Sequence, residues 1–272
     1  MLNDSTIENP LANFSKGTNG SGFYPLPTLD AVMRSKVLLT NHRESLPFRI
    51  TIARTQDQLD KAVAMRAATF GRKSLELAVI LGKPDEVDYA DGTVVLIAEC
   101  KATGDCLGTM RIASNLVEAL SQEKHPNFPA DLSGRRIARA ERLGVRPGKT
   151  ATVAKLALFK ALHRYCLAVQ IDWILVLATP PRDKDYRLLG FSEIMADTVF
   201  ESKLNPGTFQ SVLALNAHAA ERQFHSAGHH LYNFMIGTWH PDIEIFSSVQ
   251  SQWARPRGRS AVLQATTPSL PV

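Results

Sequence analysis

One stretch of this chain decides the fold: Ile137-Ala-Arg-Ala-Glu-Arg-Leu-Gly-Val145, followed by the break Arg146-Pro-Gly148. Its apolar residues alternate as in a β-strand, and the proline and glycine end the pattern. The next segment, from Thr152 to Ala168, has the apolar period of a long amphipathic helix. A second predicted strand follows, Asp172-Trp-Ile-Leu-Val-Leu-Ala-Thr179, and then Tyr186-Arg-Leu-Leu-Gly-Phe191. This order of strand, helix and strand predicts a mixed α/β core.

Outward from this core, the pattern predicts further helices and strands. Thr55-Gln-Asp-Gln58 is a capping-box sequence, which predicts a helix that reaches Phe70. A second helix is expected from residue 217 to about 232, with Asn216 as its cap. Further strands are expected at residues 48–53, 93–99, 107–113, 191–199 and 211–215. The fold class is therefore α/β (α+β), with a single mixed, largely antiparallel sheet flanked by helices.

The chain divides into three parts by composition. Residues 1–47 are expected to form an N-terminal extension with one amphipathic helix over residues 28–40. Residues 48–246 carry the regular pattern and are expected to form one domain. Residues 247–272 hold a basic, proline-containing segment, Arg255-Pro-Arg-Gly-Arg259, and are expected to form a flexible tail.

Overall composition limits the classes of protein that fit. A hydrophobic content of 44% is ordinary for a globular chain, and no apolar run approaches the roughly 20 residues that span a bilayer. The first 21 residues lack the pattern of a signal peptide, so we expect a cytoplasmic protein whose three cysteines are free thiols. A net charge of +5 suits an acidic partner, which leaves nucleic acid, an acidic protein or peripheral membrane contact open.

The charges within the central strand predict a site. Ionised side chains in an apolar strand are costly unless they are paired or face a cavity, so they mark either a site or a structural ion pair. Gly144 predicts a β-bulge that would turn a backbone N–H toward a reacting carbonyl, although an ordinary strand defect before Pro147 fits equally well. Simple alternation places Arg139, Glu141 and Leu143 on one face of the strand and Ala140, Arg142 and Gly144 on the other.

Four short motifs occur in a fixed order between Phe48 and Phe191. They are Arg66-Ala-Ala-Thr-Phe70, Asp88-Tyr-Ala-Asp91, Gly108-Thr-Met-Arg111 and Arg142-Leu-Gly-Val145. In these motifs the chain resembles the long-chain N-acyl amino acid synthases, which share the GNAT-like fold of the acyl-homoserine-lactone (autoinducer) synthases. Two departures stand out: Arg139 replaces a family glutamate, and Arg72-Lys-Ser-Leu75 stands where the autoinducer enzymes have a tryptophan. The second departure favours a free amino acid over S-adenosylmethionine as acceptor.

The resemblance implies an N-acyltransferase that joins an acyl thioester to the amine of an amino acid. Glu141 is the candidate general base, with Arg142 and Gly144 as further catalytic residues. The acyl chain is expected between the sheet halves, along Leu143, Leu175 and Leu177. The remaining substrate-binding candidates are Phe70 and four charged residues, Arg66, Asp88, Asp91 and Arg111. Together with Arg142, these four would form a charged cluster or, alternatively, a purely structural network.

The acyl donor is predicted from the turn before the long helix. Enzymes of this fold that use coenzyme A usually have a glycine-rich turn there, and Thr150-Ala-Thr-Val-Ala-Lys155 lacks one. We therefore expect an acyl carrier protein as the donor, with no resident cofactor and with acyl-coenzyme A as the less favoured co-substrate. The candidate pantetheine and carrier contacts are Val145, Lys149, Thr150 and Lys155, with Lys160 and Arg164 in the same basic stretch.

Three other functions remain open on sequence grounds: an autoinducer synthase, a coenzyme-A-dependent GNAT acetyltransferase, and a catalytically silent GNAT-fold binding module. No nucleic-acid partner is expected, because surface aromatic residues do not alternate with the basic ones. No metal site is expected either, since His225 and His229 lack a third ligand at a recognisable spacing. Trp239 and His240 are candidates to close the acceptor pocket.

Overall fold

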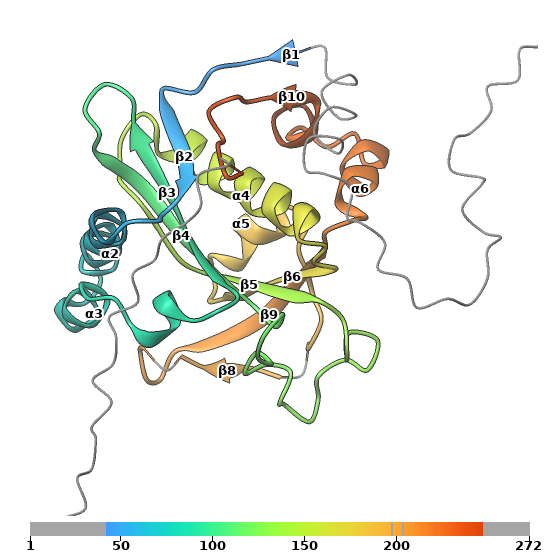
Figure 1. The fold of residues 1–272 in the computed structure, drawn as a ribbon. Coiled ribbons are helices and arrows are strands. Elements are labelled where there is room, and N and C mark those ends of the chain that lie inside the picture. Colours follow the sequence, from blue (N-terminus) through green and yellow to red (C-terminus); the bar gives the residue numbers. More distant parts are fainter. Residues whose placement is uncertain (1–41, 197, 203, 247–272) are drawn as a thin grey trace, which may run out of the picture. The chain divides into compact units, whose positions relative to one another are not determined.

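A computed structural model describes residues 42–196, 198–202 and 204–246 (Figure 1). The helix expected over residues 28–40 and the tail expected from residue 247 lie outside the described residues. Within the described part of the chain, no helix is both long enough and apolar enough to cross a membrane.

The main sheet has eight strands in the order β2-β3-β4-β5-β6-β9-β7, and β8 pairs with β9 (Figure 1). Only β5 and β6 run parallel, so the expected mixed, largely antiparallel sheet is confirmed. The strands span Phe48–Ile52 (β2), Thr93–Cys100 (β3), Cys106–Ser114 (β4), Ile137–Val145 (β5), Trp173–Ala178 (β6), Ser192–Glu193 (β7), Phe200–Glu201 (β8) and Phe209–Asn216 (β9). A separate parallel pair joins β1 (His42–Arg43) to β10 (Thr238–Trp239).

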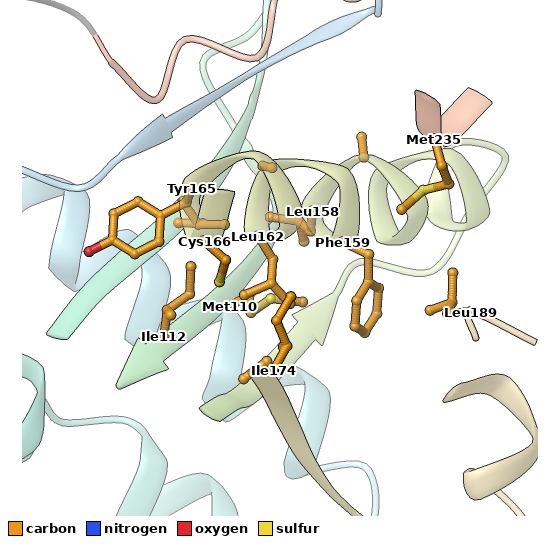
Figure 2. Close-up of a cluster of buried hydrophobic side chains, with 14 of the residues drawn as sticks. Met110, Ile112, Leu158, Phe159, Leu162, Tyr165, Cys166, Ile174, Leu189 and Met235 are labelled. Atoms are coloured by element: carbon orange, nitrogen blue, oxygen red, sulfur yellow. The ribbon is translucent and has the colours of Figure 1, made fainter. Parts of the chain in front are cut away.

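Helix α4 (Ala151–Ala168) covers one face of this sheet. Its apolar side chains, among them Leu158 and Leu162, pack onto Met110 of β4 and Ile174 of β6 (Figure 2). This is the largest apolar core of the described residues. Burial of each large apolar side chain stabilises the fold by about 1.5–3 kcal/mol relative to its exposure to water. The side chains of β5 that face α4 therefore belong to the apolar core.

The opposite face of the sheet carries helix α2 (Gln56–Phe70), which begins where the sequence predicts. The Thr55 Oγ1 accepts from the Gln58 N–H at 3.3 Å, and the Gln58 side chain accepts from the Arg54 N–H at 2.8 Å. Two elements not expected from the sequence follow, α3 (Leu75–Leu81) and the 3₁₀ turn η1 (Glu86–Tyr89). Two small apolar clusters lie on this face, one under α2 and one beside β6 and β9.

The C-terminal third of the chain departs most from expectation. The strand predicted over residues 191–199 is replaced by the two-residue strands β7 and β8, and the short helix α5 (Asp183–Arg187) precedes them. The helix predicted from 217 to 232 is only α6 (Ala220–Ser226), because Gly228 adopts a left-handed φ of 55° soon after it. The N-cap of α6 is Ala219 and not Asn216 as predicted, although the Asn216 Oδ1 accepts from the Ala219 N–H at 2.9 Å in the turn before the helix. A π-helical turn, η2 (Asn233–Gly237), completes the fold.

Candidate functional site

Strand β5 pairs with β6 over only half of its length. The parallel ladder joins Ile137–Ala140 to Trp173–Val176 and stops there, while β6 continues to pair with β9. The second half of β5 therefore diverges from β6, and this half carries Glu141 and Arg142.

A β-bulge interrupts β5 at Arg142, two residues before the glycine where the sequence predicts it. Arg111 of β4 lies opposite Glu141 and Thr109 lies opposite Gly144, so one residue of β4 faces two of β5. The bulge is at Arg142, whose φ of 55° is a left-handed conformation that is uncommon for residues other than glycine.

The bulge overturns the predicted faces of the strand. Leu143 and Val145 turn to the α4 side and pack on the large apolar core, whereas a Cβ on Gly144 would lie 3.1 Å from Thr69 of α2. Arg142 joins Arg139 and Glu141 on the α2 side. Leu143 thus lies on the opposite face from Leu175, which packs beside β9, and these two residues do not line one acyl tunnel as the sequence suggested. Helix α2 packs tightly on β5 at Gly144, since a Cβ there would also lie 3.4 Å from the Met65 backbone oxygen.

Seven side chains form a continuous network on this face, which we call the charged seam. They come from α2, η1 and its cap, β4 and β5: Arg66, Asp85, Asp88, Arg111, Arg139, Glu141 and Arg142. Of the cluster proposed from the sequence, the structure brings together Arg66, Asp88, Arg111 and Arg142, and it places the candidate base Glu141 beside them.

One end of the seam is closed to solvent. The Arg66 Nη1 lies 2.8 Å from the Asp88 Oδ1, and the two side chains are 2% and 0% exposed. Arg111, equally buried, lies 3.2 Å from the same oxygen. Burial lowers the pKa of Arg66, with partial compensation by Asp88. Burial also acts to lower the pKa of Arg111, but Glu141, Asp88 and Asp85 outweigh it and raise that pKa.

The other end of the seam opens toward water. The Glu141 Oε1 accepts from the Arg111 Nε at 2.6 Å, and its Oε2 lies 2.9 Å from the Arg139 Nη2. Asp85 accepts from Arg111 and, at 3.3 Å, from the Arg142 Nη2. The Asp85 and Glu141 side chains are 40% and 20% exposed, so solvent reaches this end of the seam. Burial acts to raise the pKa of Asp85, but its hydrogen bond from Arg111 and the two guanidinium charges lower it overall.

The seam carries more positive than negative charge. Four arginines face three carboxylates, which leaves an excess of one positive charge among these residues. The Nε atoms of Arg139 and Arg142 are also buried without a hydrogen-bond partner within the protein. The Nε and Nη2 atoms of Arg66, at the closed end, are unpaired in the same way, so it is the surplus positive charge that suits an anionic group at the open end.

Two members of the seam environment escaped the sequence analysis. Asp91, expected in the cluster, is exposed, and Asp85 occupies the place next to Arg111 and Arg142 instead. The sequence contained a signal for Asp85, because Asp85 and Asp88 have the same three-residue spacing as Asp88 and Asp91. Asp85 also caps η1 and forms a capping box with Asp88. Gln122, buried in the 115–135 connection, accepts from the Arg139 Nη1 at 2.7 Å. Phe70 is half-buried at the end of α2.

The residues expected to bind the acyl carrier are only partly at the surface. Lys149 is exposed, Thr150 caps α4 without a side-chain hydrogen bond, and the Lys155 Nζ lies 2.9 Å from the Asp185 Oδ2. Lys160, in contrast, is buried, and the Arg164 guanidinium lies 4.4 Å from the centre of the Trp239 ring. Lys160 and Arg164 therefore hold the C-terminal segment onto α4 and do not face a carrier protein.

The histidines of the C-terminal region also have packing roles. His225 packs its ring edge-on against Tyr232, and His229 does so against Phe224. No group of three or more metal-ligating side chains occurs within residues 42–246 as far as they are described. His240 is fully buried beside Lys160.

Comparison with known proteins yields matches in structure alone. No family profile and no curated protein matches the chain by sequence. Among solved structures it is similar to FeeM, an N-acyl amino acid synthase from uncultured soil microbes, with a TM-score of 0.53 and 16% identity over 69% of this chain and 97% of that one. This likeness shows the fold alone, which is GNAT-like.

Two more distant structural neighbours are a coenzyme-A-dependent acyl-homoserine lactone synthase, BjaI, and a Desulfovibrio desulfuricans protein assigned to the GNAT family of acetyltransferases. BjaI has a TM-score of 0.47 and 14% identity over 71% of this chain and 94% of its own. The second has a TM-score of 0.44 and 13% identity over 62% and 99%. Within this GNAT-like fold, the charged seam lies on the central strand where β5 and β6 diverge.

Proposed function

We propose that this protein is an N-acyltransferase that moves a long-chain acyl group from an acyl carrier protein thioester to the amine of an amino acid. The observation that carries the proposal is the open end of the charged seam, with its surplus positive charge and its partly exposed carboxylates, Asp85 and Glu141. A network that only stapled α2 to the sheet would need neither. The fold likeness to an N-acyl amino acid synthase supports the same reading.

The seam supplies complementary groups for an amino acid acceptor. The Arg142 guanidinium is suited to the acceptor carboxylate, because its planar fork donates to both oxygens at once. Asp85 and Glu141, both partly exposed, are suited to the ammonium group. A carboxylate bound at Arg142 would also neutralise the surplus charge of the seam.

The reaction joins the acceptor nitrogen to the thioester carbonyl carbon. The amine loses one proton, its lone pair forms the C–N bond, the C–S bond breaks, and the proton goes to the departing thiolate. Both oxygens of Glu141 already accept charge-assisted hydrogen bonds, so a proton taken directly would compete with Arg111 and Arg139. Each oxygen keeps a second lone pair, so we assign Glu141 to orient the amine and to accept its proton through a water molecule before the proton passes to the thiolate.

The donor would approach at the N-terminus of α4. This helix has 18 residues and no acidic residue in its first turn, so its free backbone N–H groups and its dipole favour the phosphate of a phosphopantetheine arm. Lys149, exposed beside this turn, adds positive charge for an acidic carrier protein. Because the turn lacks a run of glycines, the pyrophosphate of coenzyme A is the poorer fit.

The test is mass spectrometry of lipid extracts from a bacterial host that produces this chain. We expect new N-acyl amino acids, and we expect Glu141→Gln to reduce them by about 10²-fold or more, the usual contribution of a proton-transfer group. Glu193→Gln is the matched control, because Glu193 forms a surface ion pair with Arg187 far along the sheet. New homoserine lactones, or an unchanged lipid profile beside tight carrier binding, would contradict the proposal.

The donor is tested separately with purified protein. Acyl carrier protein and coenzyme A charged with the same fatty acyl group are offered at equal concentrations with a mixture of amino acids. We expect the higher kcat/KM with the carrier protein. Equal or better use of acyl-coenzyme A would show that the missing glycines do not decide the donor.

A further inference from the structure

Helix α3 lies beside α2 (Figure 1), and it exposes apolar side chains. Leu77 and Leu81 are buried, while Leu75, Val79 and Ile80 are 79%, 64% and 53% exposed. Large aliphatic side chains are costly to leave in water, and three on one short helix form a patch of the kind that marks an interaction surface. The charged seam does not account for this face, since none of these residues belongs to it.

Basic residues surround this patch. Arg72 and Lys73 precede α3 and Lys83 follows it, all of them exposed, whereas Glu76 is the single acidic residue between them. Partial burial lowers the pKa of Lys73, and the charge of Arg182 lowers it further, which means that Arg182 adds a fourth cation nearby. An apolar strip with a basic rim is the surface pattern of helices that lie in a membrane interface.

We propose that α3 and its basic rim, Arg72, Lys73 and Lys83, bind the surface of an anionic lipid bilayer. The helix has seven residues and is about 10 Å long, so it would lie on the membrane and not cross it. Its aliphatic side chains would enter the acyl boundary while the rim contacts anionic headgroups. The opposing basic rims of two copies would repel each other, which argues against a self-association surface. This inference rests on exposed side chains and does not depend on the proposed function.

Vesicle flotation with the purified full chain tests it. We expect binding to vesicles of equal parts phosphatidylcholine and phosphatidylglycerol, and at least tenfold weaker binding to phosphatidylcholine alone. The variant Val79→Glu/Ile80→Glu should lose about tenfold or more in binding, and Arg72→Glu/Lys73→Glu should do the same, because each basic residue contributes about 1 kcal/mol near an anionic surface. Unchanged binding by either variant would overturn the proposal.

Val199→Glu is the matched control, since Val199 is 58% exposed outside α3. It should bind vesicles as the unaltered chain does, and all the variants should retain the far-ultraviolet circular dichroism of the unaltered chain. Absence of vesicle binding overturns the proposal. So does a concentration-dependent dimer that Val79→Glu/Ile80→Glu abolishes, or carrier-protein binding that this variant abolishes while vesicle binding is unaffected. The readout is lipid binding, so it can fail while N-acyl amino acids are still made.

Discussion

The charged seam and the Lys160 site bury charge on opposite sides of the main sheet and satisfy it in different ways. In the seam, guanidinium groups face carboxylates, and the network opens to solvent at Asp85 and Glu141. At the second site the Lys160 Nζ donates to the backbone oxygens of Phe234, at 2.7 Å, and Thr238, and it lies 3.0 Å from the His240 Nδ1. No carboxylate of the described residues forms an ion pair with Lys160.

The two sites differ in what burial does to ionisation. Burial, aided by the charge of Arg164, lowers the pKa of Lys160 to about 7, and burial with Lys160 nearby lowers that of His240 to about 4. In the seam, neighbouring carboxylates raise the pKa of Arg111 despite its burial. An arginine paired with carboxylates, such as Arg111, stays ionised and can interact with a charged ligand. Lys160, which is bonded to backbone oxygens, holds the C-terminal segment in place, and its ionisation depends on pH.

The largest expected effect is at the closed end of the seam. Asp88→Asn should reduce the free energy of unfolding by about 3–5 kcal/mol, because Arg66 would then be buried without its counter-charge. Urea denaturation followed by circular dichroism measures the change.

A double variant, Arg66→Met/Asp88→Leu, sharpens this prediction. Removal of both charges should recover most of the lost stability, since buried ion pairs are often replaceable by apolar side chains. If Asp88→Asn alone costs less than about 1 kcal/mol, the closed end is not a structural ion pair.

The next effect is at the open end, where activity should fall without loss of the fold. Arg142→Gly and Arg142→Ala should each lower kcat/KM by roughly 10–150-fold, the value of a lost charge-assisted hydrogen bond of about 1.5–3 kcal/mol.

The two Arg142 variants should differ in stability. Glycine adopts the φ of 55° freely while alanine does not, so Arg142→Gly should be more stable than Arg142→Ala by about 1 kcal/mol. The urea concentrations at the midpoint of unfolding of the two variants check this order. Equal midpoints would show that the backbone is not strained at the bulge.

The last prediction concerns the pH dependence of the Lys160 site. The folded pKa of about 7 lies below the ordinary value of 10.5, so between these pH values the unfolded chain retains a proton that the folded chain has lost. Stability should therefore rise with pH in this window, by about 1.4 kcal/mol for each unit of pKa depression at most. Lys160→Met should remove the rise, and Lys155→Met, at a half-exposed lysine, should not. A rise of equal slope in all three proteins would contradict the assignment to Lys160.

Local sequence patterns predicted the elements that position the site. The alternation of Ile137–Val145, the break at Pro147 and the helical period up to Ala168 correspond to β5, its end and α4. The C-terminal third was harder, because two-residue strands and a helix ended by Gly228 leave too few residues to show a period. Asp85 was missed because two aspartate pairs with the same spacing overlap at Asp88, and spacing alone does not choose between them.

The sequence by itself determined that the central strand carries Arg139, Glu141 and Arg142 among apolar residues, and that the strand precedes a long helix. Only the tertiary structure decided which face each side chain takes, since the register against β4 forces the extra residue onto Arg142 and reverses the alternation after it. The tertiary structure also determines which charged groups pair with each other. Arg66, Asp85 and Arg111 come from three separate elements, and only packing brings them together.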